Sequence, residues 1–170
     1  MSKETIYASL TRNQKTAISI IRVSGPQTKT ILKKFLKKEV SAKEINLRNI
    51  YDSNGDFIDQ GVILFFSKPN SPTGEDVVEF HVHGSLAIIK KIELEFNKVK
   101  YVREAEPGEF AKRALQNDKI DILQVEGLDD LLEASTETQR KRAQLAFMGS
   151  VSSSLLNWRD ELIEISSYLE

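Results

Sequence analysis

Cysteine is absent from the 170-residue sequence, which excludes disulfides, thiolate metal sites and thiol nucleophiles. This absence also fits a reducing compartment. No apolar run is long enough to span a bilayer, and the start at Met1-Ser2-Lys3-Glu4 lacks the hydrophobic core of a signal peptide. We therefore expect a cytoplasmic protein that makes no membrane contact.

An excess of basic charge is also missing, because 24 Lys and Arg residues face 25 Asp and Glu residues. A net charge of −1 gives no electrostatic footprint for tight nucleic-acid binding, so any RNA contact would be local or supplied by a partner. Neither a GxxxxGK[ST] loop nor a GxGxxG motif occurs, and we expect no nucleotide hydrolysis by these residues. With 40% hydrophobic residues the chain is globular and can bury a real core.

Residues 69–84 form the stretch around which the polar candidates gather. Pro69, Pro72 and Gly74 predict a rigid turn, and the residues after it alternate in character as a strand requires. One face of this strand is predicted to be apolar and the other polar, with Val78, Phe80 and Val82 opposite Glu79, His81 and His83. The polar face is where we expect a ligand.

The preceding residues predict strands over 5–10 and 17–24, and then a helix capped by Ser24. Residues 45–51 and 57–66 predict a hairpin about Asn54-Gly55, a dipeptide that accepts positive φ at both central positions. Its second arm is almost continuously apolar, which predicts a central strand covered on both faces. A helix ending near Asn97 and a short strand near Tyr101 complete the order β, β, α, β, β, β, α, β. This order predicts an α+β fold with helices on one side of the sheet.

The remaining residues predict only helices, beginning with a short one that runs from Glu106 to Leu115. Since no strand signal follows Ile120, we predict a domain boundary near Lys119, with domains over 1–118 and 119–170. The last helix is predicted to carry a heptad seam of Met148, Val151, Leu155, Trp158, Leu162, Ile165 and Leu169. Such a seam requires a partner helix, from a second copy or from further sequence, and Gly149 within it predicts a bend. We therefore expect the chain to be the front part of a longer protein.

Several uses remain open for the polar side chains. Glu79, His81 and His83 include familiar metal ligands, but neighbouring positions on one strand face rarely converge on one ion, so we predict hydrogen-bonded histidines and no metal site. No Ser-His-Asp or Cys-His set accompanies the carboxylates, and we predict no catalytic residue. A carboxylate can instead accept two parallel N–H bonds from a ring edge, while Arg22 and Lys119 supply cations for an acidic tail. The alternative for Arg22 is a solvated arginine on an edge strand.

Four segments of the chain together resemble one family. They are residues 20–26 (IIRVSGP), 69–84 (PNSPTGEDVVEFHVHG), 107–110 (PGEF) and 117–121 (NDKID). In order and spacing they are similar to the N-terminal part of the MnmE/TrmE family of tRNA-modification GTPases. The resemblance implies a mixed-sheet, tetrahydrofolate-binding and dimerisation domain similar to aminomethyltransferase folate domains, followed by the start of an all-α domain. The family's folate contacts map onto Arg22, Glu79 and Lys119.

The resemblance also implies a biochemical setting. A 5-formyl or 5,10-methylene tetrahydrofolate would supply a one-carbon unit for a carboxymethylaminomethyl-type group on the wobble uridine of tRNA. The partners implied are a second copy of the chain, a flavin-dependent protein of MnmG/GidA type, and tRNA. GTP, K⁺ and Mg²⁺ would belong to a GTPase domain that these 170 residues do not include, nor do they include the family's C-terminal cysteine motif. GTP hydrolysis and complete tRNA modification are therefore expected to lie beyond them.

Three positions depart from the family pattern. The segment 12–17 (RNQKTA) replaces a glycine-rich run, Ser85 replaces a second glycine, and His81 stands where a glutamine is usual.

The alternative function is a truncated helical assembly module that dimerises without binding folate. Folate affinity that depends on Arg22 and Glu79 would distinguish the two.

Overall fold

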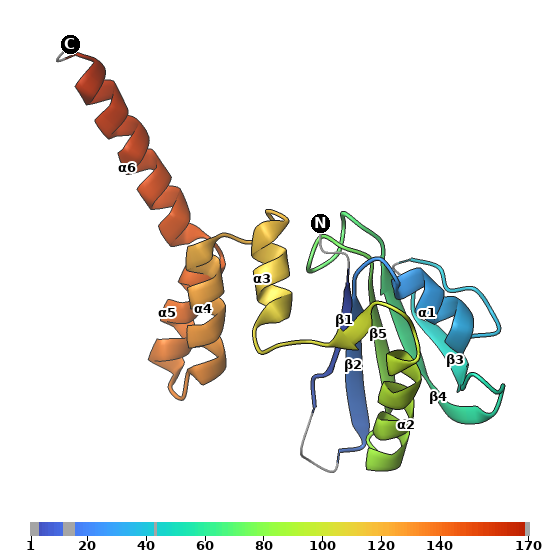
Figure 1. Ribbon diagram of the computed structural model, residues 1–170. Coiled ribbons are helices and arrows are strands. Elements are labelled where there is room, and N and C mark those ends of the chain that lie inside the picture. Colours follow the sequence, from blue (N-terminus) through green and yellow to red (C-terminus); the bar gives the residue numbers. More distant parts are fainter. Residues whose placement is uncertain (1–3, 12–15, 43, 169–170) are drawn as a thin grey trace. The chain divides into compact units, whose positions relative to one another are not determined.

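The computed structural model describes residues 4–11, 16–42 and 44–168 (Figure 1). It divides into two compact units, Met1–Arg113 and Ala114–Glu170. This division falls within helix α3 (Glu109–Gln116), a few residues before the boundary predicted near Lys119, and that boundary stays a prediction. The loop 12–17, which departs from the family pattern, lies largely outside the described residues.

The first unit is built on a six-stranded sheet of order β3-β4-β5-β2-β1-β6. Its strands are β1 (Thr5–Ser9), β2 (Ile18–Ser24), β3 (Asn46–Tyr51), β4 (Phe57–Phe66), β5 (Val77–His83) and β6 (Val102–Glu104). Only the pair β1 and β6 is parallel among these strands, so the sheet is mixed. The predicted α+β class and the predicted order of elements are confirmed.

Two helices, α1 (Thr28–Phe35) and α2 (Leu86–Asn97), share the core on one face of this sheet (Figure 1). Phe35 of α1 packs against Phe96 of α2 with ring centroids 4.9 Å apart and against Phe80 of β5 at 6.2 Å. Edge-to-face contacts of this kind add to the apolar area that the rings bury. The predicted placement of both helices on one side of the sheet is therefore confirmed.

The hairpin of β3 and β4 forms as predicted, but its turn differs in detail. Gly55 has a φ of 87°, whereas Asn54 is outside the left-handed region, so the prediction of positive φ at both positions is wrong. The reason is Asp52, whose carboxylate accepts the backbone N–H groups of Asn54 and Asp56, each at 2.9 Å. A side chain that bonds its own turn in this way fixes a conformation that needs only one left-handed residue.

Two other local predictions are wrong. Strand β4 is internal as expected, but its residues alternate between buried and half-buried, so one face of the sheet is covered less than the other. Helix α1 begins at Thr28 with Gln27 before it, and Ser24 does not cap it. The Ser24 hydroxyl instead lies in the core of the unit, 2.7 Å from the Thr73 hydroxyl.

The second unit contains α4 (Ile122–Glu133), α5 (Glu137–Phe147) and α6 (Ser150–Ser167). Capping boxes begin α4, through Asp121 and Gln124, and α5, through Thr136 and Gln139. Helices α4 and α5 pack closely at Gly127. A Cβ atom added at this position would lie only 2.5 Å from the Phe147 backbone nitrogen. Among the described residues, no helix combines the length and the apolar character needed to cross a membrane.

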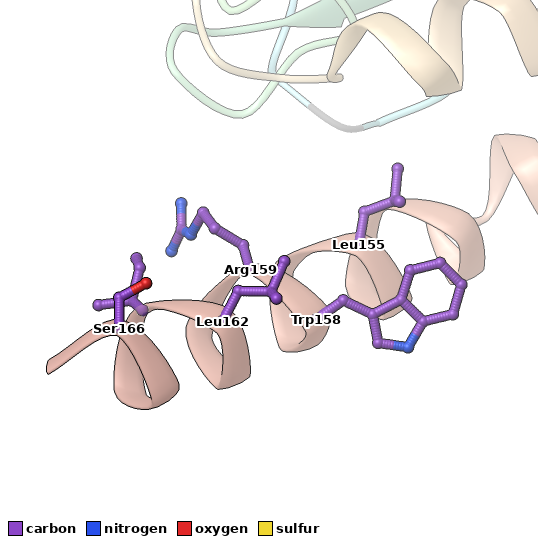
Figure 2. A pocket seen from close by; sticks show the side chains of 6 residues that line it. Leu155, Trp158, Arg159, Leu162 and Ser166 are labelled. Atoms are coloured by element: carbon purple, nitrogen blue, oxygen red, sulfur yellow. The ribbon is translucent and has the colours of Figure 1, made fainter. Parts of the chain in front are cut away.

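The heptad seam is interrupted at its start, because Gly149 adopts a φ of 80° and separates α5 from α6. The predicted single helix with a bend is therefore wrong: Met148 caps α5, and Leu169 lies outside the described residues. Figure 2 shows Leu155, Trp158 and Leu162 projecting from α6, and these side chains are 45%, 60% and 64% exposed. A partner helix for this seam stays a prediction.

Candidate functional site

Arg22 and Glu79 meet on the less covered face of the sheet. They are direct cross-strand partners in the antiparallel pair of β2 and β5. The Nε of Arg22 donates to Oε1 of Glu79 at 2.9 Å, and Nη2 of Arg22 lies 2.8 Å from the same oxygen. Strand β2 is internal in the sheet, so the alternative of a solvated edge arginine for Arg22 is wrong. The side chains are 27% and 12% exposed, which leaves the pair accessible to a ligand but partly shielded from water.

His81 adds a third polar group to this pair. Its Nε2 lies 3.2 Å from Oε2 of Glu79, so both carboxylate oxygens have partners. The residues aligned beside these three across the neighbouring strands are apolar and half-buried, namely Ala8, Ile20, Val62 and Leu64. The site is thus a small charged cluster set in a half-exposed apolar surface. Such a surface suits a planar ring, and the charges suit polar groups at the ligand's edges.

The turn before β5 is held to the sheet by buried polar contacts. Ser24 donates to Oε2 of Glu75 at 2.7 Å, and Nη1 of Arg113 donates to the same oxygen at 3.0 Å. Arg113 is only 3% exposed, and its Nη1 also donates to the backbone carbonyl of Glu4 at 2.9 Å. Glu75 therefore anchors the turn, and this structural role accounts for its charge without any acid–base function.

A second buried carboxylate fixes the start of α3. Glu109 accepts hydrogen bonds from Nη1 and Nη2 of Arg103 at 2.8 and 2.7 Å, and from Nη2 of Arg113 at 3.1 Å. The Arg103 hydrogen bonds, supported by the backbone N–H of Glu106 and by Arg113, lower the pKa of Glu109 from its ordinary 4.5 to about 2. The same contact raises the pKa of Arg103 above its ordinary value.

The aromatic residue that follows Glu109 reaches the site. The ring centroid of Phe110 lies 5.6 Å from the guanidinium carbon of Arg22, within the range of a cation–π contact. Neither Phe110 nor Arg113 was predicted as a site residue. The spacing of Glu109 and Arg113 by four positions in a helix was a signal for their ion pair, but nothing in the sequence indicates that Phe110 meets Arg22.

The remaining candidates serve other contacts. Asp76 accepts from the backbone N–H of Lys68, and His83 binds Asp59 through both its backbone N–H and its Nδ1. Both histidines are thus hydrogen-bonded, as predicted. Within the described ranges, no group of three or more His, Asp or Glu side chains is arranged to hold a metal ion.

Lys119 belongs to the second unit. It is exposed, and its backbone N–H donates to the carbonyl of Ala114 at 2.8 Å at the end of α3. Of the three predicted folate contacts, the structure thus brings Arg22 and Glu79 together within one unit.

Comparison with known proteins gives a consistent result over the whole chain. A sequence profile described as "GTP-binding protein TrmE N-terminus" matches residues 5–119. A tRNA modification GTPase MnmE from Ruegeria sp. (strain TM1040) is 40% identical over 167 residues, which cover 98% of this chain and 39% of the relative. The mitochondrial tRNA modification GTPase gtpbp3 of Dictyostelium discoideum is 42% identical over 176 residues, covering 99% of this chain and 34% of that protein.

A further MnmE, from Wolbachia sp. subsp. Drosophila simulans (strain wRi), is 42% identical over 170 residues, covering 99% of this chain and 38% of the relative. The chain thus spans only about a third to two fifths of the length of the curated relatives it matches. Because the profile covers well over half of its residues, this chain belongs to the TrmE N-terminus family.

Proposed function

We propose that the first unit binds a tetrahydrofolate derivative through Arg22 and Glu79, with Lys119 as a further cation. The observation that carries this proposal is the pairing of Arg22 with Glu79 on a half-exposed apolar face of the sheet. A folate combines a planar ring that bears hydrogen-bond donors with an anionic glutamate tail. The apolar surface suits the ring, and the charged pair offers both an acceptor and a cation.

The hydrogen-bond inventory of the pair tests how such a ligand fits. A carboxylate offers roughly four acceptor positions, and in Glu79 two of them are used, by the Arg22 Nε on Oε1 and by the His81 Nε2 on Oε2. The Nη2 of Arg22 lies 2.8 Å from Oε1 as an ion-pair contact. The carboxylate therefore keeps about two acceptor positions, one on each oxygen, for a ring edge that donates two parallel bonds. On Arg22, Nη1 makes no hydrogen bond within the described part of the chain. An anionic group on the ligand thus fits Arg22 directly.

We further propose that the chain is the N-terminal part of a GTPase that modifies the wobble uridine of tRNA with a carboxymethylaminomethyl-type group. The printed names of its relatives, which are tRNA modification GTPases, support this proposal. Bound tetrahydrofolate would supply the one-carbon unit, and the residues described above would bind and orient it. A second copy of the chain, a flavin-dependent MnmG/GidA-type protein and tRNA are the proposed partners, in the cytoplasm. GTP, K⁺ and Mg²⁺ would bind outside these residues.

The experiment is calorimetric titration of the 170-residue chain with 5-formyltetrahydrofolate, alongside Arg22→Ala, Glu79→Ala and Lys119→Ala. Each lost charge-assisted contact is expected to weaken binding by about 1.5 to 3 kcal/mol, or roughly 10- to 150-fold. Arg140→Ala is the matched control, because Arg140 forms an exposed ion pair with Glu137 on α5. Binding that none of the three site variants weakens would contradict the site assignment, whereas an unchanged Lys119→Ala alone would remove only Lys119.

The helical assembly module is a second candidate, favoured by the exposed apolar residues of α6. A seam of this kind is satisfied when a second helix covers its a and d positions. In that case the chain would be a dimer with no folate affinity, and Leu155→Lys with Leu162→Lys would make it monomeric in sedimentation equilibrium. This candidate would be contradicted if the chain binds folate and if the two substitutions leave its oligomeric state unchanged.

A further inference from the structure

The contact between Phe110 and Arg22 is a side-chain contact of the site to which the proposed folate binding gives no role. Arg22 lies on β2 and Phe110 on α3, and 88 positions separate them in the chain. The distance of 5.6 Å from the guanidinium carbon to the ring centroid is within the approximately 6 Å limit for cation–π attraction. Both side chains are half-buried, and partial desolvation strengthens such a contact.

The residue that precedes Phe110 is held firmly in place. Glu109, the first residue of α3, is 9% exposed and accepts three hydrogen bonds from the two arginines Arg103 and Arg113. Its carboxylate also accepts the backbone N–H of Glu106 at 2.9 Å. The carboxylate of the residue before Phe110 thus accepts four hydrogen bonds, and this restricts where the neighbouring ring can lie.

These contacts leave one part of the Arg22 guanidinium available. The Nε of Arg22 donates a hydrogen bond to Glu79, and Nη2 lies 2.8 Å from the same carboxylate oxygen as an ion-pair contact. Phe110 lies within cation–π distance of the guanidinium, and Nη1 makes no hydrogen bond within the described residues. A long arginine side chain loses rotamer freedom when it binds a ligand, and this cost falls if the group is already held in place. Preorganisation by an aromatic ring would therefore increase affinity without any direct contact to the ligand.

We propose that Phe110 is a positioning residue of the ligand site, whose ring holds the Arg22 guanidinium so that Nη1 is free to bind an anionic group of the ligand. This inference rests on the proposed folate binding and adds to it a specific role for the α3 aromatic residue. The group that Nη1 binds is a carboxylate of the glutamate tail. A planar carboxylate matches the geometry of guanidinium donors.

The test replaces Phe110 by phenylalanine analogues with increasing ring fluorination, which withdraw electron density while keeping the shape of the ring. Affinity for 5-formyltetrahydrofolate is expected to fall stepwise along this series, with a total loss of about 2- to 30-fold. Phe110→Leu should lose a similar factor, and Phe110→Tyr should keep wild-type affinity because it retains an electron-rich ring. If Phe110 acted through packing alone, ring fluorination would leave the affinity for 5-formyltetrahydrofolate unchanged.

Phe57→Leu is the matched control, since Phe57 lies on β4 of the same unit and is 60% exposed. It should leave affinity unchanged. Equal affinity across the fluorinated series, with wild-type protein that binds normally, would overturn the positioning role and leave the proposed folate binding intact.

A measurement on the ligand-free protein separates the remaining outcomes. The ring current of Phe110 should shift the Nε–H signal of Arg22 in ¹H–¹⁵N spectra, and Phe110→Leu should abolish that shift. If the shift is missing, the contact and the positioning role are both overturned. If the shift is present but wild-type protein binds no folate, the proposed function fails, and with it the part of the inference that assigns Nη1 to a carboxylate.

Discussion

Glu109→Gln tests whether the buried carboxylate at the start of α3 stabilises the first unit as its surroundings indicate. Arg103 and Arg113 together donate three hydrogen bonds to this carboxylate, and Arg113 is 3% exposed. A lowering of the pKa of Glu109 from 4.5 to about 2 corresponds to about 3 kcal/mol of stabilisation when the group is ionised. Because a glutamine side chain keeps one oxygen acceptor, this figure is a ceiling, and we expect Glu109→Gln to cost about 2 to 3 kcal/mol at pH 7.

The sign of the pH dependence follows from the direction of the shift. Since the folded-state pKa is depressed, the stabilisation is complete above the unfolded-state pKa of about 4.5 and is lost as pH falls toward about 2. By pH 3.5 the wild-type chain should have lost about 1.4 kcal/mol of its advantage over Glu109→Gln. The difference between the two proteins should therefore shrink on acidification, whatever the other carboxyl groups contribute.

The assay is urea unfolding at several pH values. Hydrogen exchange of peptides from β1 and β5, which both belong to the first unit, is the readout. Glu106→Gln is the control, because Glu106 is exposed and lies three residues away in the same segment. A difference between wild type and Glu109→Gln that stays constant from pH 7 to pH 3.5 would refute this reasoning. So would a Glu106→Gln chain that is destabilised to the same extent.

Two further predictions concern the hairpin and the helical unit. Lys91 donates a hydrogen bond to Asp52 and lowers the pKa of that carboxyl from 3.8 to about 2, so Asp52→Asn should destabilise the first unit above pH 4. That effect should fade as pH drops toward 2, and thermal unfolding of both proteins across this range measures it. Gly127→Ala should destabilise the second unit by about 1 to 3 kcal/mol, because its Cβ would meet the Phe147 backbone at 2.5 Å. Hydrogen exchange of peptides from α4 and α5 measures that destabilisation, and wild-type stability would contradict the close packing of these two helices.

The charged pair of the candidate site could be predicted only in part from local sequence patterns. The alternation of residues 77–83 predicted that Glu79 and His81 share a polar face, and the structure confirms it. The pattern around Arg22 did not decide between a solvated edge position and a site position, because strand order depends on which strands pair. Only the placement of β2 beside β5 brings Arg22 to Glu79, 57 positions further along the chain.

Two of the wrong predictions have different physical causes. Ser24 has the chemistry of a helix cap, but its hydroxyl bonds Thr73 and Glu75, which come from a turn distant in sequence. Asn54-Gly55 has the composition of a two-residue turn, but the carboxylate of Asp52 imposes a different one. Ser24 thus finds its partners in the tertiary structure, whereas the turn is changed by a local side chain that bonds the backbone N–H groups of its own loop.

By itself, the sequence determined the succession of strands and helices along the chain, the apolar and polar faces of β5 and the capping boxes that begin α4 and α5. These features depend on neighbours within about four residues, so periodicity and local hydrogen bonding are sufficient to specify them. The tertiary structure alone decided the strand order, the burial of Arg113 between Glu75 and Glu109, and the approach of Phe110 to Arg22. Such contacts join residues tens of positions apart, and they form only when the packing of the whole unit fixes the register of its strands.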